Sequence, residues 1–330
     1  MTDEQLFDTR FCDLPLRVEG SPLKHRLSQL YKELESRGLR FKPHVWLSKE
    51  WFTPDRIPGF AIPFYLAHPR LVRLERKQML EVEGGTEKEC LQIMRHETGH
   101  TIDNAFQLHS RPRYRELFGS FAHRYPDWYK PEPHSRNYVL HLPAWYAQAH
   151  PAEDFAETFA VWLVTGSRWK RQYEGWPALK KLEYVDQIMK AIAGKSPLAR
   201  SRQRFEDLPE IRMTLREHYR VKRRHYAFHR MADYDHGLQR VFSSEARHKQ
   251  RPSAVTFLRH HRRELCQEVA EGTGVHSYAI HQMFLPMIDR CRELKLRLGL
   301  TEAHTKQRLL VLLTVQTMNG VRSGYHRIAL

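Results

Sequence analysis

His96-Glu97-Thr98-Gly99-His100 is the stretch that decides how the rest of this chain is interpreted. Thr86 and Glu89 precede it with the spacing of a capping box, and apolar residues recur around it at helical spacing, so the sequence predicts a helix over this region. On that helix His96 and His100 lie one turn apart on the same face. Both imidazoles can therefore reach one tetrahedral zinc ion at about 2.0–2.1 Å.

Glu97 projects beside the two histidines. A carboxylate at this position is too far round the helix to complete the ligand set comfortably, but it is well placed to take a proton from a water molecule on the metal. The chain contains 21 histidines in 330 residues, so the same pattern could arise by chance on an ordinary amphipathic helix. A third ligand is needed to decide between the two interpretations.

The metzincin class of zinc peptidases is excluded. That class requires Gly three residues after the second histidine of the motif and His six residues after it. Asp103 and Phe106 occupy those positions in this chain.

A second helix is predicted over residues 151–163, where aromatic and aliphatic residues cover almost the whole surface. Glu153 and Glu157 share one face of this helix. Buried carboxylates are costly unless a cation or hydrogen-bond donors receive them. We therefore expect Glu153 to be the third zinc ligand and Glu157 to orient His96 or His100 through its free ring nitrogen. The alternative is a surface helix on which both glutamates pair with Arg or Lys.

These residues resemble a bacterial family of zinc-binding metallopeptidases of the gluzincin type. The likeness covers about residues 41–192, and its motifs are H-E-x-G-H at 96–100 and, after a long insert, Tyr146-Ala147-x-x-His150-Pro151-x-Glu153-Asp154-Phe155-Ala156-Glu157. A weaker likeness extends to the catalytic domain of anthrax lethal factor. There the first Glu of the second motif supplies the third zinc ligand, and a Tyr at the position of Tyr146 lies over the metal.

The resemblance implies an α+β, zincin-like fold and a zinc-dependent hydrolase that cleaves peptide bonds. Zinc with three protein ligands keeps an open position, where bound water has its pKa lowered to about 7. We expect Glu97 to act as the general base that takes a proton from this water and passes it to the leaving amine. The resemblance implies that Tyr146 hydrogen-bonds the oxyanion.

Residues 108–149, between the two predicted helices, form an irregular insert rich in His, Arg, Tyr, Trp and Pro. We expect this insert to form a wall of the substrate cleft, because long loops beside a metal site usually carry specificity. Its histidines are alternative metal ligands, although none has a partner at ligand spacing on a predicted helix. They are His109, His123, His134 and His141.

The region before the zinc motif is predicted to contain a helix over 22–37 and then a small sheet. Strands are expected at 60–66 and 71–76, and Pro63 marks the first of them as an edge strand. An edge strand beside a zinc site could align an extended peptide by strand pairing. The alternative is an edge that the proline merely protects.

Two domains are predicted: a catalytic domain of residues 1–195, closed by a helix over 177–193, and a basic helical lobe of residues 196–330. The lobe contains 25 Lys and Arg against 13 Asp and Glu, whereas the first domain contains 29 against 25. Helices are expected in the lobe at 207–231, 253–271, 276–298 and 302–318.

The charge surplus favours acidic partners, either a peptide or protein substrate bearing Asp or Glu, or nucleic acid. Basic residues at 220–230 are interleaved with aromatic side chains that could stack on bases. The competing hypothesis is therefore a zinc-containing regulatory protein whose lobe binds nucleic acid or an acidic protein. His225 and His229 have the spacing of a second metal pair, but they lack a carboxylate partner, so we favour the interpretation in which they bind no metal.

Composition favours a soluble, cytoplasmic protein with no membrane partner. The chain is 41% hydrophobic and 28% charged, and its longest apolar run, residues 309–313, is far too short to span a bilayer. The acidic N-terminal segment lacks the apolar region of a signal peptide. The four cysteines form no C-x-x-C pair, as expected of reduced thiols packed as small apolar groups.

Overall fold

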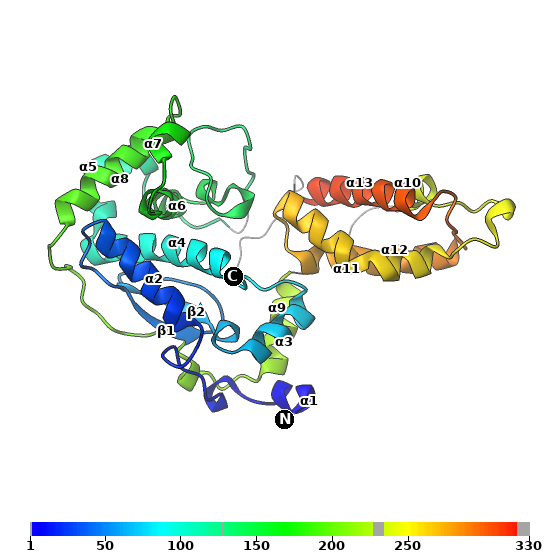
Figure 1. Ribbon diagram of the computed structural model, residues 1–330, viewed down its shortest axis with the longest axis horizontal. Coiled ribbons are helices and arrows are strands. Elements are labelled where there is room, and N and C mark those ends of the chain that lie inside the picture. Colours follow the sequence, from blue (N-terminus) through cyan, green and yellow to red (C-terminus); the bar gives the residue numbers. More distant parts are fainter. Residues whose placement is uncertain (1, 127–128, 227–233, 322–330) are drawn as a thin grey trace. The chain divides into compact units, whose positions relative to one another are not determined.

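The computed structural model describes residues 2–126, 129–226 and 234–321 (Figure 1). The described chain forms two compact units, the first from residues 2–76 and 82–219 and the second from residues 77–81 and 220–321. The expected α+β class is confirmed, because many helices accompany one small sheet. The division into a catalytic domain and a basic lobe at residue 195 stays a prediction.

The sheet lies in the first unit and has two parallel strands, β1 (His44–Ser48) and β2 (Gly59–Pro63), with Trp46 opposite Ala61. All five residues of β2 are buried. Phe52 also pairs with Ala61, whose amide donates to the Phe52 carbonyl at 2.8 Å. Ala61 therefore has a backbone partner on each side, so the edge at which we weighed pairing with a peptide is occupied at this residue.

The predicted strands are corrected in two places. The first ends at Pro63 rather than at residue 66, because Phe64–Ala67 form a 3-10 helix. The second is wrong, because residues 71–76 lie in the helix α3 (Pro69–Met79). Leu71 and Leu74 are both buried and lie three residues apart, which is a helical spacing that would place them on opposite faces of a strand.

Four helices of the first unit were predicted, and each is present, with every end that was predicted within one residue of the observed one. In α4 the Thr86 hydroxyl accepts from the Glu89 amide, and the Glu89 carboxylate accepts from the Thr86 amide, so the predicted capping box is formed. These four helices are α2 (Leu23–Ser36), α4 (Glu87–Phe106), α6 (Pro151–Leu163) and α8 (Ala178–Ile192). Shorter helices are α1 (Asp3–Phe7), α5 (Pro112–Phe118) and α7 (Trp169–Gln172), and α9 (Leu215–His225) follows them.

The helices α4 and α6 lie against each other at the centre of the first unit (Figure 1). They approach closely at Gly99, where an added Cβ would lie 2.7 Å from the Cα of Ala156. Phe155 and Phe159 of α6 are completely buried in the same core. Because glycine has no side chain, the backbones can approach closely enough to bring the polar residues of the two helices together.

The second unit is helical, with α10 (Asp235–Val241), α11 (Ala254–Thr273), α12 (Ser277–Glu293) and α13 (Glu302–Gly320) around one apolar core. The helices predicted at 253–271 and 302–318 are confirmed. The one predicted at 276–298 ends earlier, at Glu293, shortly before Lys295 adopts a positive φ of 53°.

The helix predicted over 207–231 is wrong in its first part. Residues 208–210 form a 3-10 helix that contains Pro209, and α9 begins only at Leu215. Residues 227–231 of this prediction, with His229 and Arg230, lie outside the described residues. The helix α10 was not predicted.

No helix in the described part of the chain combines the length and the apolar character needed to cross a bilayer. The four cysteines are free, and Cys90, Cys266 and Cys291 are buried. This agrees with the expectation that they pack as small apolar groups.

Candidate metal centre

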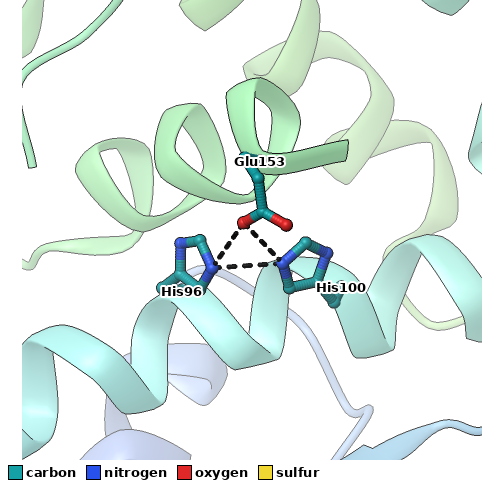
Figure 2. Close-up of side chains that lie close together, drawn as sticks. All are labelled: His96, His100 and Glu153. Carbon is teal, nitrogen blue, oxygen red and sulfur yellow. Dashed lines mark hydrogen bonds and ion pairs between the residues drawn. The ribbon is translucent and has the colours of Figure 1, made fainter. Parts of the chain in front are cut away.

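Two histidines of α4 and one glutamate in the first turn of α6 point toward one another (Figure 2). Oε2 of Glu153 lies 3.0 Å from Nε2 of His96 and 3.2 Å from Nε2 of His100. The two Nε2 atoms are 3.1 Å apart. The three atoms thus form a nearly equilateral triangle.

The size of this triangle fits a zinc ion. In a tetrahedral site with bonds of about 2.0–2.1 Å, neighbouring ligand atoms lie about 3.3 Å apart, which is close to the three observed separations. Two imidazole nitrogens and a carboxylate oxygen all carry lone pairs, so their convergence in a buried place is unfavourable unless a cation or a proton is shared among them. The donor set, two neutral nitrogens and one carboxylate oxygen, is one that zinc accepts.

The electrostatics of the site also favour a positive charge among these residues. Burial opposes ionisation of His96, but its hydrogen bonds to Glu153 and Glu157 outweigh this effect and hold its pKa well above the usual value. Burial also opposes the charge on Glu153, yet the two histidines hold the pKa of this carboxyl well below its usual range. Both shifts have one cause, which is that the carboxylates stabilise a cation placed beside them.

Glu157 lies behind His96, one helical turn after Glu153. Its Oε1 is 2.7 Å from Nδ1 of His96, and its Oε2 accepts the amide of Leu142 at 2.8 Å. A histidine that binds metal through Nε2 usually donates its Nδ1–H to such a group. The sequence left open which histidine Glu157 would orient, and the structure brings it to His96.

Glu97 is 7% exposed, and its Oε2 accepts a hydrogen bond of 2.7 Å from the hydroxyl of Thr53. Thr53 belongs to the segment between the two strands. The Asn104 side chain also holds this segment against α4, by donating to the carbonyls of Pro54 at 3.0 Å and Ile57 at 3.1 Å. Sequence reasoning missed Thr53, because its contact joins residues 44 positions apart.

Tyr146 lies in a 3-10 helix, η4 (Pro143–Gln148), with its ring centroid 5.6 Å from that of His96. Ala144 and Trp145 just before it have positive φ angles of 60° and 55°. Such angles cost about 1 kcal/mol or more each in residues other than glycine, so other contacts must maintain them; one is the 2.7 Å bond from the Tyr129 hydroxyl to the Ala144 carbonyl. Burial raises the pKa of Tyr146 well above its usual value, so its hydroxyl keeps the proton that a hydrogen-bond donor needs.

Tyr125 of the insert is a further site residue to which the sequence assigned no function. Its hydroxyl donates to Oε1 of Glu153 at 2.9 Å. No local pattern identifies this contact, because the two residues are 28 positions apart and Tyr125 lies in no helix or strand. Asp127 and Trp128, in the same aromatic stretch, lie outside the described residues.

The insert histidines that we weighed as alternative ligands do not join the three donors. Nδ1 of His109 lies 2.9 Å from Oδ1 of Asp103, and Nε2 of His141 lies 2.9 Å from the Gln92 carbonyl. His123 and His134 are exposed. Across the described residues, none of these four belongs to a group of donor atoms close enough to share an ion.

One other group of donor atoms occurs in the described chain, formed in the second unit by His260, His261 and Glu302. Nε2 of His261 is 2.7 Å from Glu302, and its Nδ1 is 3.4 Å from Glu264. His260 and Glu302 are exposed to solvent. Because water can solvate these groups, surface ion pairs between α11 and α13 account for the cluster without a metal.

Comparison with known proteins agrees with the chemistry of the first group. No match was found among curated proteins or among solved structures. Residues 73–170, which include α4, the insert and α6, match a family model described as "Putative zinc-binding metallo-peptidase". This match supports the resemblance to a family of zinc-binding metallopeptidases.

Proposed function

We propose that this protein is a zinc-dependent hydrolase, a gluzincin-type metallopeptidase with a zincin-like site that cleaves peptide bonds. The observation that carries the proposal is the triangle of buried His96, partly buried His100 and buried Glu153, with Glu157 behind His96. The family match over residues 73–170 supports the general activity.

His96, His100 and Glu153 would hold the zinc ion. When bound, zinc supplies a Lewis acid that polarises a carbonyl and makes a nearby water more acidic. Glu157 fixes the tautomer of His96: because Nδ1 faces the Glu157 carboxylate at 2.7 Å, the proton stays on Nδ1 and the lone pair of Nε2 is directed at the triangle.

Glu97 would act as the general base. It accepts a proton from the attacking water and then gives it to the leaving amine. The Thr53 hydroxyl holds one of its carboxylate oxygens at 2.7 Å, which limits rotation of the carboxylate. A base held in one orientation loses less entropy when the substrate arrives.

Tyr146 would donate a hydrogen bond to the oxyanion that develops on the scissile carbonyl. Its ring lies beside His96, and its hydroxyl stays protonated at neutral pH because burial raises its pKa. Tyr146→Phe should therefore lower kcat by about 10²–10³, as expected for one lost oxyanion donor, and leave zinc affinity unchanged.

The decisive experiment compares Glu97→Gln with Glu87→Gln, an exposed glutamate on the same helix. Cleavage of a peptide library by the zinc-loaded protein is followed by mass spectrometry, with zinc content and circular dichroism as checks on metal and fold. We expect Glu97→Gln to lose at least about 10²-fold in rate while keeping zinc and fold, because an amide cannot accept the proton. Glu87→Gln should retain wild-type activity.

Full activity in Glu97→Gln would show that another group is the base. If the zinc-loaded wild-type protein cleaves no peptide in the library, the regulatory interpretation, in which the basic lobe binds nucleic acid or an acidic protein, becomes the better one.

A further inference from the structure

The two oxygens of the Glu153 carboxylate have different neighbours. Oε2 faces both histidines, at 3.0 and 3.2 Å, whereas Oε1 accepts the Tyr125 hydroxyl at 2.9 Å. The terminal torsion of a glutamate is broad, so the backbone of α6 does not by itself fix the plane of the carboxylate. A donor to the oxygen that faces away from the histidines restricts rotation of this plane.

His150 holds Tyr125 in place. The two rings are stacked, with centroids 3.8 Å apart and planes inclined by 18°. Nδ1 of His150 accepts the amide of Ala152 at 3.1 Å, which makes His150 the N-cap of α6, and its Nε2 lies 2.9 Å from the carbonyl of His123. These two bonds require a neutral ring with its proton on Nε2. One side chain thus connects the start of α6 to the insert segment that carries Tyr125.

We infer that Tyr125 is a positioning residue, which acts through Glu153 to present one carboxylate oxygen to the metal. This inference rests on the proposed function in one respect, which is that His96, His100 and Glu153 bind zinc. It gives the insert a second task besides the expected one of forming a wall of the substrate cleft, because part of the insert then helps to retain the metal. Groups that hydrogen-bond a metal-ligating carboxylate typically contribute 10–100-fold to metal affinity.

The test measures zinc affinity of the full chain, by competition with a chromophoric chelator, and needs no substrate. Tyr125→Phe removes only the hydroxyl, and Tyr125 is 45% exposed, so the variant should fold. The matched control is Tyr129→Phe, which also removes one hydroxyl from the insert, the donor to the Ala144 carbonyl at 2.7 Å. We expect the zinc dissociation constant to rise about 10–100-fold in Tyr125→Phe and less than about threefold in Tyr129→Phe.

A double-mutant cycle shows whether the effect passes through Glu153. In a Glu153→Ala background, Tyr125→Phe should change zinc affinity no further, because its partner has gone. Circular dichroism and thermal unfolding of the metal-free variants check that each remains folded.

The outcomes separate this inference from the proposed function. If the wild-type protein binds zinc and Tyr125→Phe binds it equally well, or no worse than Tyr129→Phe, the positioning assignment is overturned and the proposed function stands. An effect of Tyr125→Phe that persists in the Glu153→Ala background would overturn it as well. A wild-type protein that binds no zinc would overturn both.

Discussion

Gly99 offers the strictest test of how the two site helices are placed. In Gly99→Ala the new Cβ would lie 2.7 Å from the Cα of Ala156 and 3.0 Å from its carbonyl oxygen. Carbon atoms in contact normally lie about 3.5–4.0 Å apart, so α4 and α6 must separate by roughly 0.8 Å or more. Rotation of a side chain cannot relieve the clash, because the obstructing atoms belong to the backbone of α6.

The cost can be worked out from two opposing effects. Overpacking a core costs about 1–3 kcal/mol, and a clash with backbone belongs at the upper end of this range. Alanine is better than glycine in a helix by about 1 kcal/mol. The net loss in the free energy of unfolding is therefore about 2 kcal/mol, which lowers Tm by about 4–8 °C in a unit of this size.

The same separation would displace His96 and His100 relative to Glu153. Zinc sites tolerate deviations of only about 0.2 Å in ligand distance, so we expect zinc affinity to fall at least about tenfold, or about 1.4 kcal/mol. Tm should be measured on the metal-free protein by calorimetry, so that lost stability is separated from lost zinc. Affinity is then measured by chelator competition.

Two further variants serve as controls. Gly272 lies in α11, and no heavy atom of the described residues comes within 4 Å of the position that an added Cβ would take, so Gly272→Ala should leave Tm unchanged or raise it slightly. Ala156→Gly, combined with Gly99→Ala, should not fully restore Tm, because the Ala156 methyl lies 3.2 Å from the added Cβ, whereas the shorter contacts of 2.7 and 3.0 Å are with Cα and the carbonyl oxygen. A Gly99→Ala protein with wild-type Tm and zinc affinity would refute the close-approach explanation.

Two other predictions concern two thiols of the second unit and the charge of residues 196–330. Burial raises the pKa of Cys266 and of Cys291 to about 12, so a thiol reagent at pH 8 should leave both unmodified in the folded protein and reach all four cysteines only after unfolding. Thiols of the unfolded chain ionise near pH 8.5, whereas these two ionise only near pH 12 in the folded protein, so the free energy of unfolding should fall as pH rises above about 8.5. The expected fall is up to about 1.4 kcal/mol per pH unit for each thiol. Denaturant titrations in which the variant with both cysteines replaced by Ala shows the same fall would contradict the assignment. Residues 196–330 contain 25 basic and 13 acidic residues, and this positive charge should make acidic peptides better substrates than basic ones at low salt. The preference should fade near physiological ionic strength, where charges are screened within about 8 Å. Equal cleavage rates for acidic and basic peptides at all salt concentrations would show that the charge does not act on substrates.

The helices of the first unit were predictable because their signals are local. The capping box of Thr86 and Glu89 and the proline at position 151 lie within one turn of the helix start that they mark. The three candidate ligands were predictable for a related reason. His96 and His100 are four residues apart, and Glu153 stands on a helix so apolar that its charge needs a partner.

The contacts that support the site were not predictable, because they join distant parts of the chain. Thr53 meets Glu97 and Tyr125 meets Glu153 across 44 and 28 residues, and neither Thr53 nor Tyr125 lies in a helix or strand. Gly99 was visible in the sequence, but its importance depends on Ala156, which lies on another helix. The misassigned strand at 71–76 has another cause, since so short a segment contains too few apolar residues to establish a period.

The irregular insert and the candidate metal centre depend on each other. The insert supplies the Tyr125 hydroxyl to Glu153, the Leu142 amide to Glu157 and the Tyr146 ring beside His96. Contacts with residues of α4 and α6 therefore contribute to the conformation of the insert, which explains why local sequence patterns predicted little structure there. If these contacts raise affinity for the metal, thermodynamic linkage requires that the bound metal stabilise the insert in this conformation by the same free energy.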